Sequence, residues 1–235
     1  MIDKKRPCVL IIALILSLSC LWGGDTASFV DLGFSSDGKT YMFGQYGVQS
    51  QTLKPWADLF VVDVSQNDFV PNGKISYVHD RPVIAGQDGS GALYRLISRN
   101  AALADRYDIN FLHQGQALYI TPDNGGNLPS PGETIEFRDF ESGISYKAAL
   151  VSLIEGSGAN LKSSFYINLE RNAQGGAKKT YIVGSPHIKR PLVVSYRIKK
   201  VMVAPRDGSI IFVVEMRKQG ADGTDIRYMV EALRI

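Results

Sequence analysis

A motif that occurs near both ends of the 235-residue chain constrains its fold more than any other feature. The first copy has the letters FSSDGK at residues 34–39, and the second has APRDGS at residues 204–209. In both, an apolar segment follows the Asp-Gly pair, and another begins near an aspartate about 20 residues later, Asp58 or Asp225. Asp-Gly between apolar segments favours a hairpin, because glycine accepts a positive φ and aspartate bonds to its own backbone. The motif therefore predicts the same β-sheet unit at both ends.

The chain between the two copies also has the pattern of short strands separated by glycine-rich turns. Residues 92–106 are the exception, because Leu93, Leu96 and Ala101 fall on one face of a helix there. The sequence predicts a mainly β fold: a single domain of antiparallel sheets, propeller-like or sandwich-like, with one amphipathic helix near 92–106.

The first residues have the pattern of an export signal. A basic stretch at residues 4–6 precedes an apolar run from Cys8 to Trp22. This run is shorter than the roughly 20 residues that span a bilayer, and it fits a secretory leader. We expect a signal peptide at residues 1–23 and a β-rich exported domain at residues 24–235, with no transmembrane span after the leader is removed.

The two cysteines, Cys8 and Cys20, both lie in this leader, so the exported domain has no disulfide and no thiolate metal site. The expected location is the periplasm or the exterior. The alternative is a lipoprotein anchored at Cys20, because residues 17–20 partly resemble a lipoprotein cleavage box.

Positive charge is concentrated late in the chain. Residues 24–170 have 10 basic and 17 acidic residues, whereas residues 171–206 have nine basic residues and no acidic one. We call seven of these nine the basic segment and predict that they form a binding surface: Lys178, Lys179, Lys189, Arg190, Arg197, Lys199 and Lys200. The charges favour an envelope protein, a glycan or an anionic lipid as partner, and no motif indicates nucleic acid.

The sequence leaves two questions about the basic segment open: on which face of the strand its charges lie, and whether they are paired with acidic residues. Alternation along the strand after Leu192 puts Arg197 and Lys199 on one face and Lys200 on the other, unless a bulge shifts the register. The charges could also belong to a solvated sheet face, where they pair with the acidic remainder of the molecule.

Other local patterns give weaker signals. The glycine-rich loop at residues 86–91 precedes the expected helix, but it lacks the elements of a phosphate-binding loop, and its Asp88 or Ser90 is expected to cap the helix. The three histidines, His79, His113 and His187, have no metal-ligand spacing. We therefore name no catalytic residue, metal site or cofactor.

The terminal motifs resemble the blades of WD-repeat and Tol-type propellers over about residues 31–64 and 202–235. With the leader and the stretch DTASFVDLGFSSDG at residues 25–38, the whole chain resembles the family of predicted secreted proteins called domain of unknown function 2259. This resemblance implies export and supplies no catalytic residues.

Two functions remain. The favoured one is an exported, non-catalytic binding domain that docks an anionic component or acidic partner through the basic segment. The alternative is an exported hydrolase whose site is assembled from distant strands, for example from His187 and a carboxylate.

Overall fold

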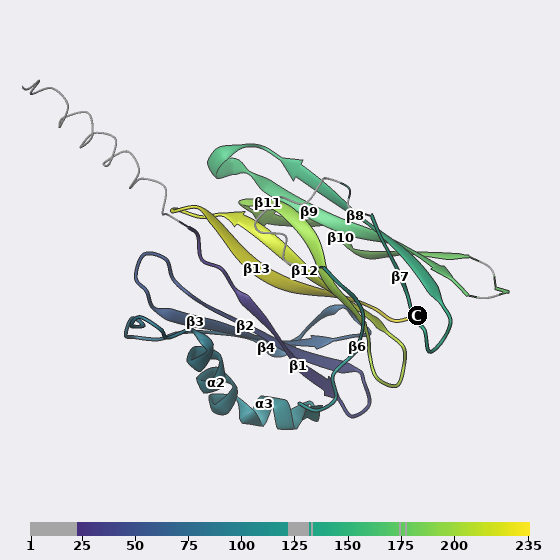
Figure 1. Ribbon diagram of the computed structural model, residues 1–235, viewed down its shortest axis with the longest axis horizontal. Coiled ribbons are helices and arrows are strands. Elements are labelled where there is room, and N and C mark those ends of the chain that lie inside the picture. Colours follow the sequence, from purple (N-terminus) through teal and green to yellow (C-terminus); the bar gives the residue numbers. More distant parts are fainter. Residues whose placement is uncertain (1–22, 122–131, 133, 174, 177) are drawn as a thin grey trace, which may run out of the picture.

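Three antiparallel sheets lie face to face, and two helices cover the outside of the first sheet (Figure 1). The computed structural model describes residues 23–121, 132, 134–173, 175–176 and 178–235. The expected signal peptide, up to residue 22, and Cys20 lie outside these described residues. We name the layers the N-terminal, central and outer sheets. The mainly β, sandwich-like fold class is confirmed.

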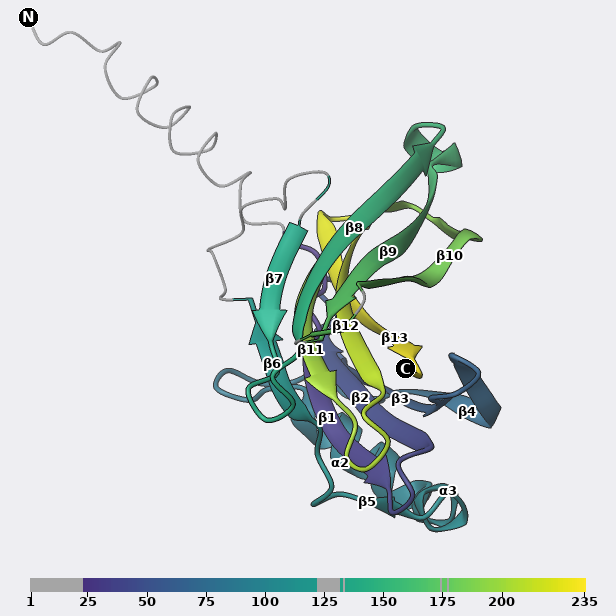
Figure 2. The same ribbon diagram turned by 90° about the vertical axis from the view of Figure 1, so that its right-hand side faces the viewer.

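Each sheet is built from consecutive hairpins, apart from the edge strands β5 and β6. The N-terminal sheet has the order β4-β3-β2-β1-β5, with β1 Ser28–Ser35, β2 Thr40–Val48, β3 Pro55–Asp63, β4 Asp68–Val78 and β5 Ile109–Asn110. The central sheet has the order β13-β12-β11-β6, with β6 Gln116–Ile120, β11 Val193–Val203, β12 Ile210–Gln219 and β13 Thr224–Leu233. The outer sheet has the order β10-β9-β8-β7, with β7 Thr134–Arg138, β8 Ser145–Glu155, β9 Lys162–Asn172 and β10 Lys179–Pro191. A short 3-10 turn, Gly158–Asn160, joins β8 to β9, and β6 and β7 lie next to each other (Figure 2).

The central sheet is buried on both faces, which explains the apolar run of β12. Ile210, Phe212 and Val214 pack into the core shared with the outer sheet. The alternate residues Ile211 and Val213 pack into the core shared with the N-terminal sheet. A strand with neighbours on both faces needs apolar residues at every position, because successive side chains point to opposite sides.

The two copies of the repeated motif form equivalent turns. The Asp37 carboxylate accepts the amide of Lys39 at 3.0 Å, and the Asp207 carboxylate accepts the amide of Ser209 at 2.9 Å. The glycines that follow these aspartates have φ of 77° and 73°. Each hairpin is therefore fixed by an aspartate that bonds two residues ahead and by a glycine that tolerates positive φ.

The two repeats also touch. A Cβ atom added to Gly38 would lie 2.6 Å from the Pro205 carbonyl oxygen, so the turns are in close contact. Side chains of both repeats share one apolar cluster, with Phe43 from the first and Ile211 from the second. The propeller expectation is not confirmed, because the described sheets form an open stack and do not close into a ring.

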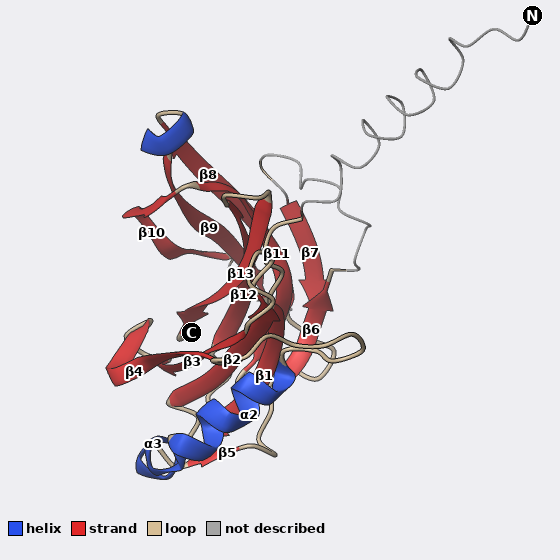
Figure 3. Cartoon of the chain, turned by 90° about the vertical axis from the view of Figure 1, so that its left-hand side faces the viewer, coloured by secondary structure: helices blue, strands red, loops and turns tan. Residues whose placement is uncertain are grey.

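The expected helix at 92–106 is two helices, α2 Ser90–Arg99 and α3 Ala101–Arg106 (Figure 3). They meet at Asn100, whose φ of −118° and ψ of 25° are not helical. The Asn100 side chain donates to the Leu96 carbonyl at 2.8 Å and ends the first helix. Side-chain bonds of this kind compete with helix continuation, which explains the break inside an apolar stripe.

A buried carboxylate joins all three sheets. Glu231 of β13 is 5 % exposed and accepts a hydrogen bond from the side chain of Asn67, in the β3–β4 turn, at 2.6 Å. Asn67 also accepts the amide of Ala232 at 2.6 Å, and Arg190 of the outer sheet lies 3.6 Å from the second Glu231 oxygen. Burial raises the pKa of Glu231 above its ordinary value of 4.5, by more than Asn67 and Arg190 lower it.

Glu231→Gln should therefore weaken the pH dependence of stability in mildly acidic solution. A raised pKa in the folded state means that this state holds a proton at pH values where the unfolded chain has released it. The wild-type free energy of unfolding should thus rise, relative to that of the variant, as the pH falls from 7 toward 4.5. Urea unfolding at several pH values measures this difference. Glu155→Gln, at an exposed carboxylate, is the control, and equal pH slopes for wild type and Glu231→Gln would contradict the assignment.

Candidate functional site

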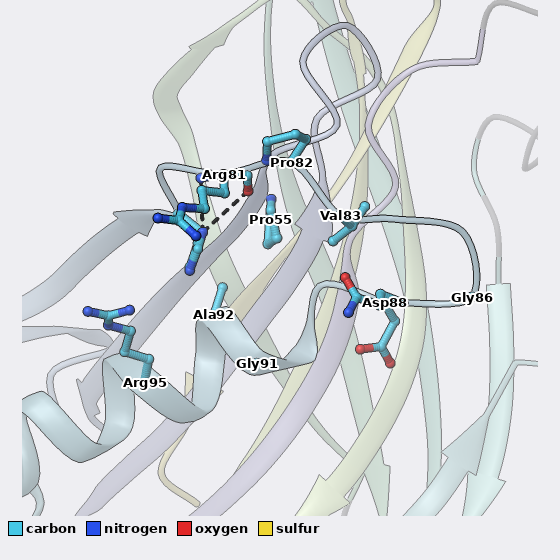
Figure 4. Close-up of a pocket in the computed structure, with 11 residues that line it drawn as sticks. Pro55, Arg81, Pro82, Val83, Gly86, Asp88, Gly91, Ala92 and Arg95 are labelled. Carbon is cyan, nitrogen blue, oxygen red and sulfur yellow. Dashed lines mark hydrogen bonds between the residues drawn. The ribbon is translucent and has the colours of Figure 1, made fainter.

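A cleft lies where β4 ends and α2 begins. It has a volume of about 670 Å³. Figure 4 shows Arg81 and Arg95 on one side of it and Asp88 on the other. The lining residues come from the start of β3, the segment after β4, the glycine-rich loop and the first turns of α2: Pro55, His79, Arg81, Pro82, Val83, Gly86, Gln87, Asp88, Gly91, Ala92 and Arg95.

Backbone contacts with β3 and the loop before it hold the upper wall of the cleft. The amide of His79 donates to the Pro55 carbonyl at 2.8 Å, and the amide of Val83 donates to the Leu53 carbonyl at 2.8 Å. Residues 79–83, which include Arg81, are therefore held at both ends by backbone hydrogen bonds to Leu53 and Pro55. The Nδ1 atom of His79 accepts a hydrogen bond from the backbone amide of Arg81 at 3.0 Å, which further fixes the backbone at Arg81.

Helix α2 forms the lower wall and approaches the sheet closely. A Cβ atom on Gly89 would lie 2.4 Å from the Gly47 carbonyl oxygen, so only glycine fits immediately before the helix. Ala92 and Leu93 anchor the first turn in the apolar cluster beneath. Gly91 lines the cleft and is exposed, and a Cβ atom added there would meet no other atom within 4 Å.

The residues that line the cleft have two arginines and one carboxylate, so positive charge is in excess. Asp88 contributes the one carboxylate among its lining residues, and this group accepts the Ser90 amide at 3.0 Å and the Ser90 hydroxyl at 2.6 Å. These bonds, with the hydroxyl first, lower the pKa of Asp88. The expected capping of α2 by Asp88 or Ser90 is wrong, because the N-cap residue is Gly89 and it makes no side-chain cap bond; Asp88 lies one residue earlier and bonds to Ser90. Within the described ranges, no carboxylate lies within ion-pair distance of the Arg81 or Arg95 guanidinium.

The seven residues of the basic segment do not gather in one patch. Lys178 and Lys179 lie at the start of β10, and Lys189 and Arg190 lie near its end. The other three lie on β11 of the central sheet, where the register shifts between Ile198 and Lys200. The bulge left open by the sequence is therefore present.

Most of this segment has acidic partners. Lys178 pairs with Glu170 at 2.8 Å, and Lys189 pairs with Glu155 at 2.6 Å. The Lys200 ammonium lies 3.0 Å from Asp31 of the N-terminal sheet.

The other four residues of the basic segment differ in their contacts and in their burial. Arg190 reaches the buried Glu231 and also covers the Phe165 ring. Arg197 and Lys199 are half-buried, and Lys179 is exposed. Whether these residues contact a partner stays a prediction.

The histidines are dispersed. His79 lines the cleft, the His113 carbonyl accepts the Phe34 amide, and His187 is exposed in the irregular part of β10. In the part of the chain that the structure describes, no group of three or more His, Cys, Asp or Glu side chains could hold a metal ion.

Sequence reasoning missed the cleft because its arginines are on different elements. Arg81 follows β4, and Arg95 lies on α2 beyond an intervening loop, so no spacing pattern connects them. Two signals were available: the glycine-rich loop at residues 86–91, which lines the cleft but lacks the elements of a phosphate-binding loop, and the position of Arg95 off the apolar face of the helix.

The chain matches the family model described as "Predicted secreted protein (DUF2259)" over residues 42–234. No curated protein and no solved structure matches it. Among the described residues, no helix has the length and apolar character needed to cross a membrane. The family match covers more than half of the sequence, and the chain therefore belongs to the DUF2259 family of predicted secreted proteins.

Proposed function

We propose that the protein is an exported binding domain that holds an anionic group in the cleft between β4 and α2. The observation that carries this proposal is the presence of two guanidinium groups at one concave site, neither of which has a carboxylate partner among the residues that the structure describes. Arginine presents a planar set of donors that matches the geometry of carboxylates and phosphates.

The surroundings of the cleft support the same assignment. The His79 ring also lines the cleft, and so does the first turn of α2, where the helix dipole contributes a partial positive charge. Asp88 is already bonded to Ser90, so it does not need an arginine partner. An anion that enters the cleft would supply the two guanidinium groups with the negative partner that no described carboxylate provides.

The signal peptide predicted from the sequence supports a proposal for where the protein is located. We place the protein in the periplasm or outside the cell, with lipid anchoring at Cys20 as the alternative, and with an envelope protein, a glycan or an anionic lipid as partner. Docking through the basic segment is a separate proposal. It has less support, because Lys178, Lys189, Arg190 and Lys200 are engaged by acidic residues.

Arg81→Gln combined with Arg95→Gln should weaken phosphate binding at least about tenfold, because two exposed charge-assisted contacts are lost. Isothermal titration of inorganic phosphate at low salt measures the affinity. The matched control is Lys178→Gln with Lys179→Gln, which removes the same charge from the basic segment. A larger loss in this control than in the cleft variant would contradict the proposal.

A further inference from the structure

Basic side chains continue beyond the cleft in a row along α2 and β4. Tyr77 of β4 lies at the centre of this row. The Arg95 guanidinium is 5.7 Å and the Arg99 guanidinium 5.2 Å from the Tyr77 ring centroid. The His79 ring packs edge-on against Tyr77 at 6.3 Å, and the next residue but one is Arg81. Arg99, Tyr77, Arg95, His79 and Arg81 thus form one continuous set, which we call the cationic row.

The two secondary-structure periods set the spacing in the cationic row. Arg95 and Arg99 are four residues apart on α2, which separates them by about 6 Å along the helix axis. Tyr77 and His79 are two residues apart along the chain and share one side, with a similar separation of about 6.6 Å. Both arginines and Arg81 are exposed, and Tyr77 and His79 between them are half-buried.

We propose that the ligand of the cleft is an extended acidic polysaccharide, with one carboxylate between Arg81 and Arg95 and the next at Arg99. This inference rests on the proposed function of the cleft. A single compact anion would occupy the cleft and leave Arg99 unused. A polymer with one carboxylate per sugar ring matches charges that are spaced by about one helical turn.

The chemistry of the row favours a sugar chain over two other polyanions. The repeat of polyphosphate is shorter than that of a sugar chain, so its charges are closer together than one helical turn and would place uncompensated phosphates over the Tyr77 ring. A lipid bilayer is broad, whereas the first binding position lies inside a concave site. Sugar hydroxyls, in contrast, can bond to Gln87, which lines the cleft, and to the phenol of Tyr77, against which Arg95 and Arg99 lie.

The test compares the affinity of the protein for mannuronate oligomers of increasing length. The affinity of wild type should rise from the single sugar to the longer oligomers. Arg99→Gln should reduce affinity for the long oligomer about fivefold, because one exposed ion pair is lost, and should leave the single sugar unaffected. Arg106→Gln removes the same charge from α3, outside the cationic row, and should change neither affinity.

Three results would overturn the inference. Affinity could be independent of oligomer length, Arg99→Gln could behave like Arg106→Gln, or polyphosphate or phosphatidylglycerol vesicles could bind more tightly than the polyuronate. If single anions still bind and depend on Arg81 and Arg95, the proposed function stands and only the polysaccharide assignment fails. If Arg81→Gln with Arg95→Gln changes no affinity, the cleft itself is not the site.

Discussion

Phe212→Ala should lower the free energy of unfolding by about 4 kcal/mol, a loss typical of a phenylalanine removed from a packed core. Phe212 is 0 % exposed and lies on β12, in the cluster that joins the central and outer sheets. The opposite face of β12 is covered by the N-terminal sheet, so the strand cannot move to fill the space. The residual cavity adds to the lost burial of apolar surface.

Urea unfolding followed by tryptophan fluorescence measures this loss. The control is Ile182→Ala on β10, because this side chain is 67 % exposed and its removal should change stability by less than about 0.5 kcal/mol. Similar effects of the two substitutions would show that the central sheet does not form the shared core.

Lys200→Met should destabilise the protein by about 2–3 kcal/mol, because it leaves the Asp31 carboxylate without its partner. The two side chains are 22 % and 11 % exposed and lie 3.0 Å apart across the N-terminal and central sheets. Burial, and secondarily the Asp31 charge, raise the pKa of the nearby Tyr41 phenol well above its usual value. A lone carboxylate in this environment is costly, although partial exposure makes the loss smaller than at a fully buried site.

The double variant Asp31→Asn with Lys200→Met isolates this cause. It should recover at least half of the lost stability, because no unpaired charge remains. Lys178→Met is the surface control, since its pair with Glu170 is more exposed and should contribute less than about 1 kcal/mol. If the double variant is no more stable than Lys200→Met, the loss comes from packing and not from the charge.

The local parts of the fold could be predicted from the sequence. Asp37 and Asp207 mark their turns because each bonds to a backbone amide two residues ahead, and this bond needs only neighbouring residues. The order of the sheets is different, because it depends on contacts between residues far apart in the chain. The resemblance to propeller blades reflects the hairpins and carries no information about closure.

The helix shows how one residue can override a longer pattern. The apolar stripe continues from Leu96 to Ala104, and both are buried. Only the side chain of Asn100, which bonds back to the Leu96 carbonyl, divides it into two helices. A periodic pattern predicts which face is buried more reliably than it predicts where a helix ends.

The candidate site could not be found by counting charges. The basic segment is the most positive stretch of the sequence, but Lys200 is paired with an aspartate 169 residues away. Arg81 and Arg95 lie in the acidic part of the chain, yet among the described residues no carboxylate lies within ion-pair distance of either guanidinium. Net charge along a sequence therefore shows where cations are, and the tertiary structure decides which of them can take a ligand.

The most direct test of the cleft is a titration of the protein with inorganic phosphate, followed by amide chemical shifts. We predict that the largest shifts fall on residues 79–95, which include the segment after β4, the glycine-rich loop and the start of α2. The largest shifts on residues 178–200 would contradict the assignment of the cleft and favour the basic segment. Shifts that scatter over the surface with no saturation would contradict both.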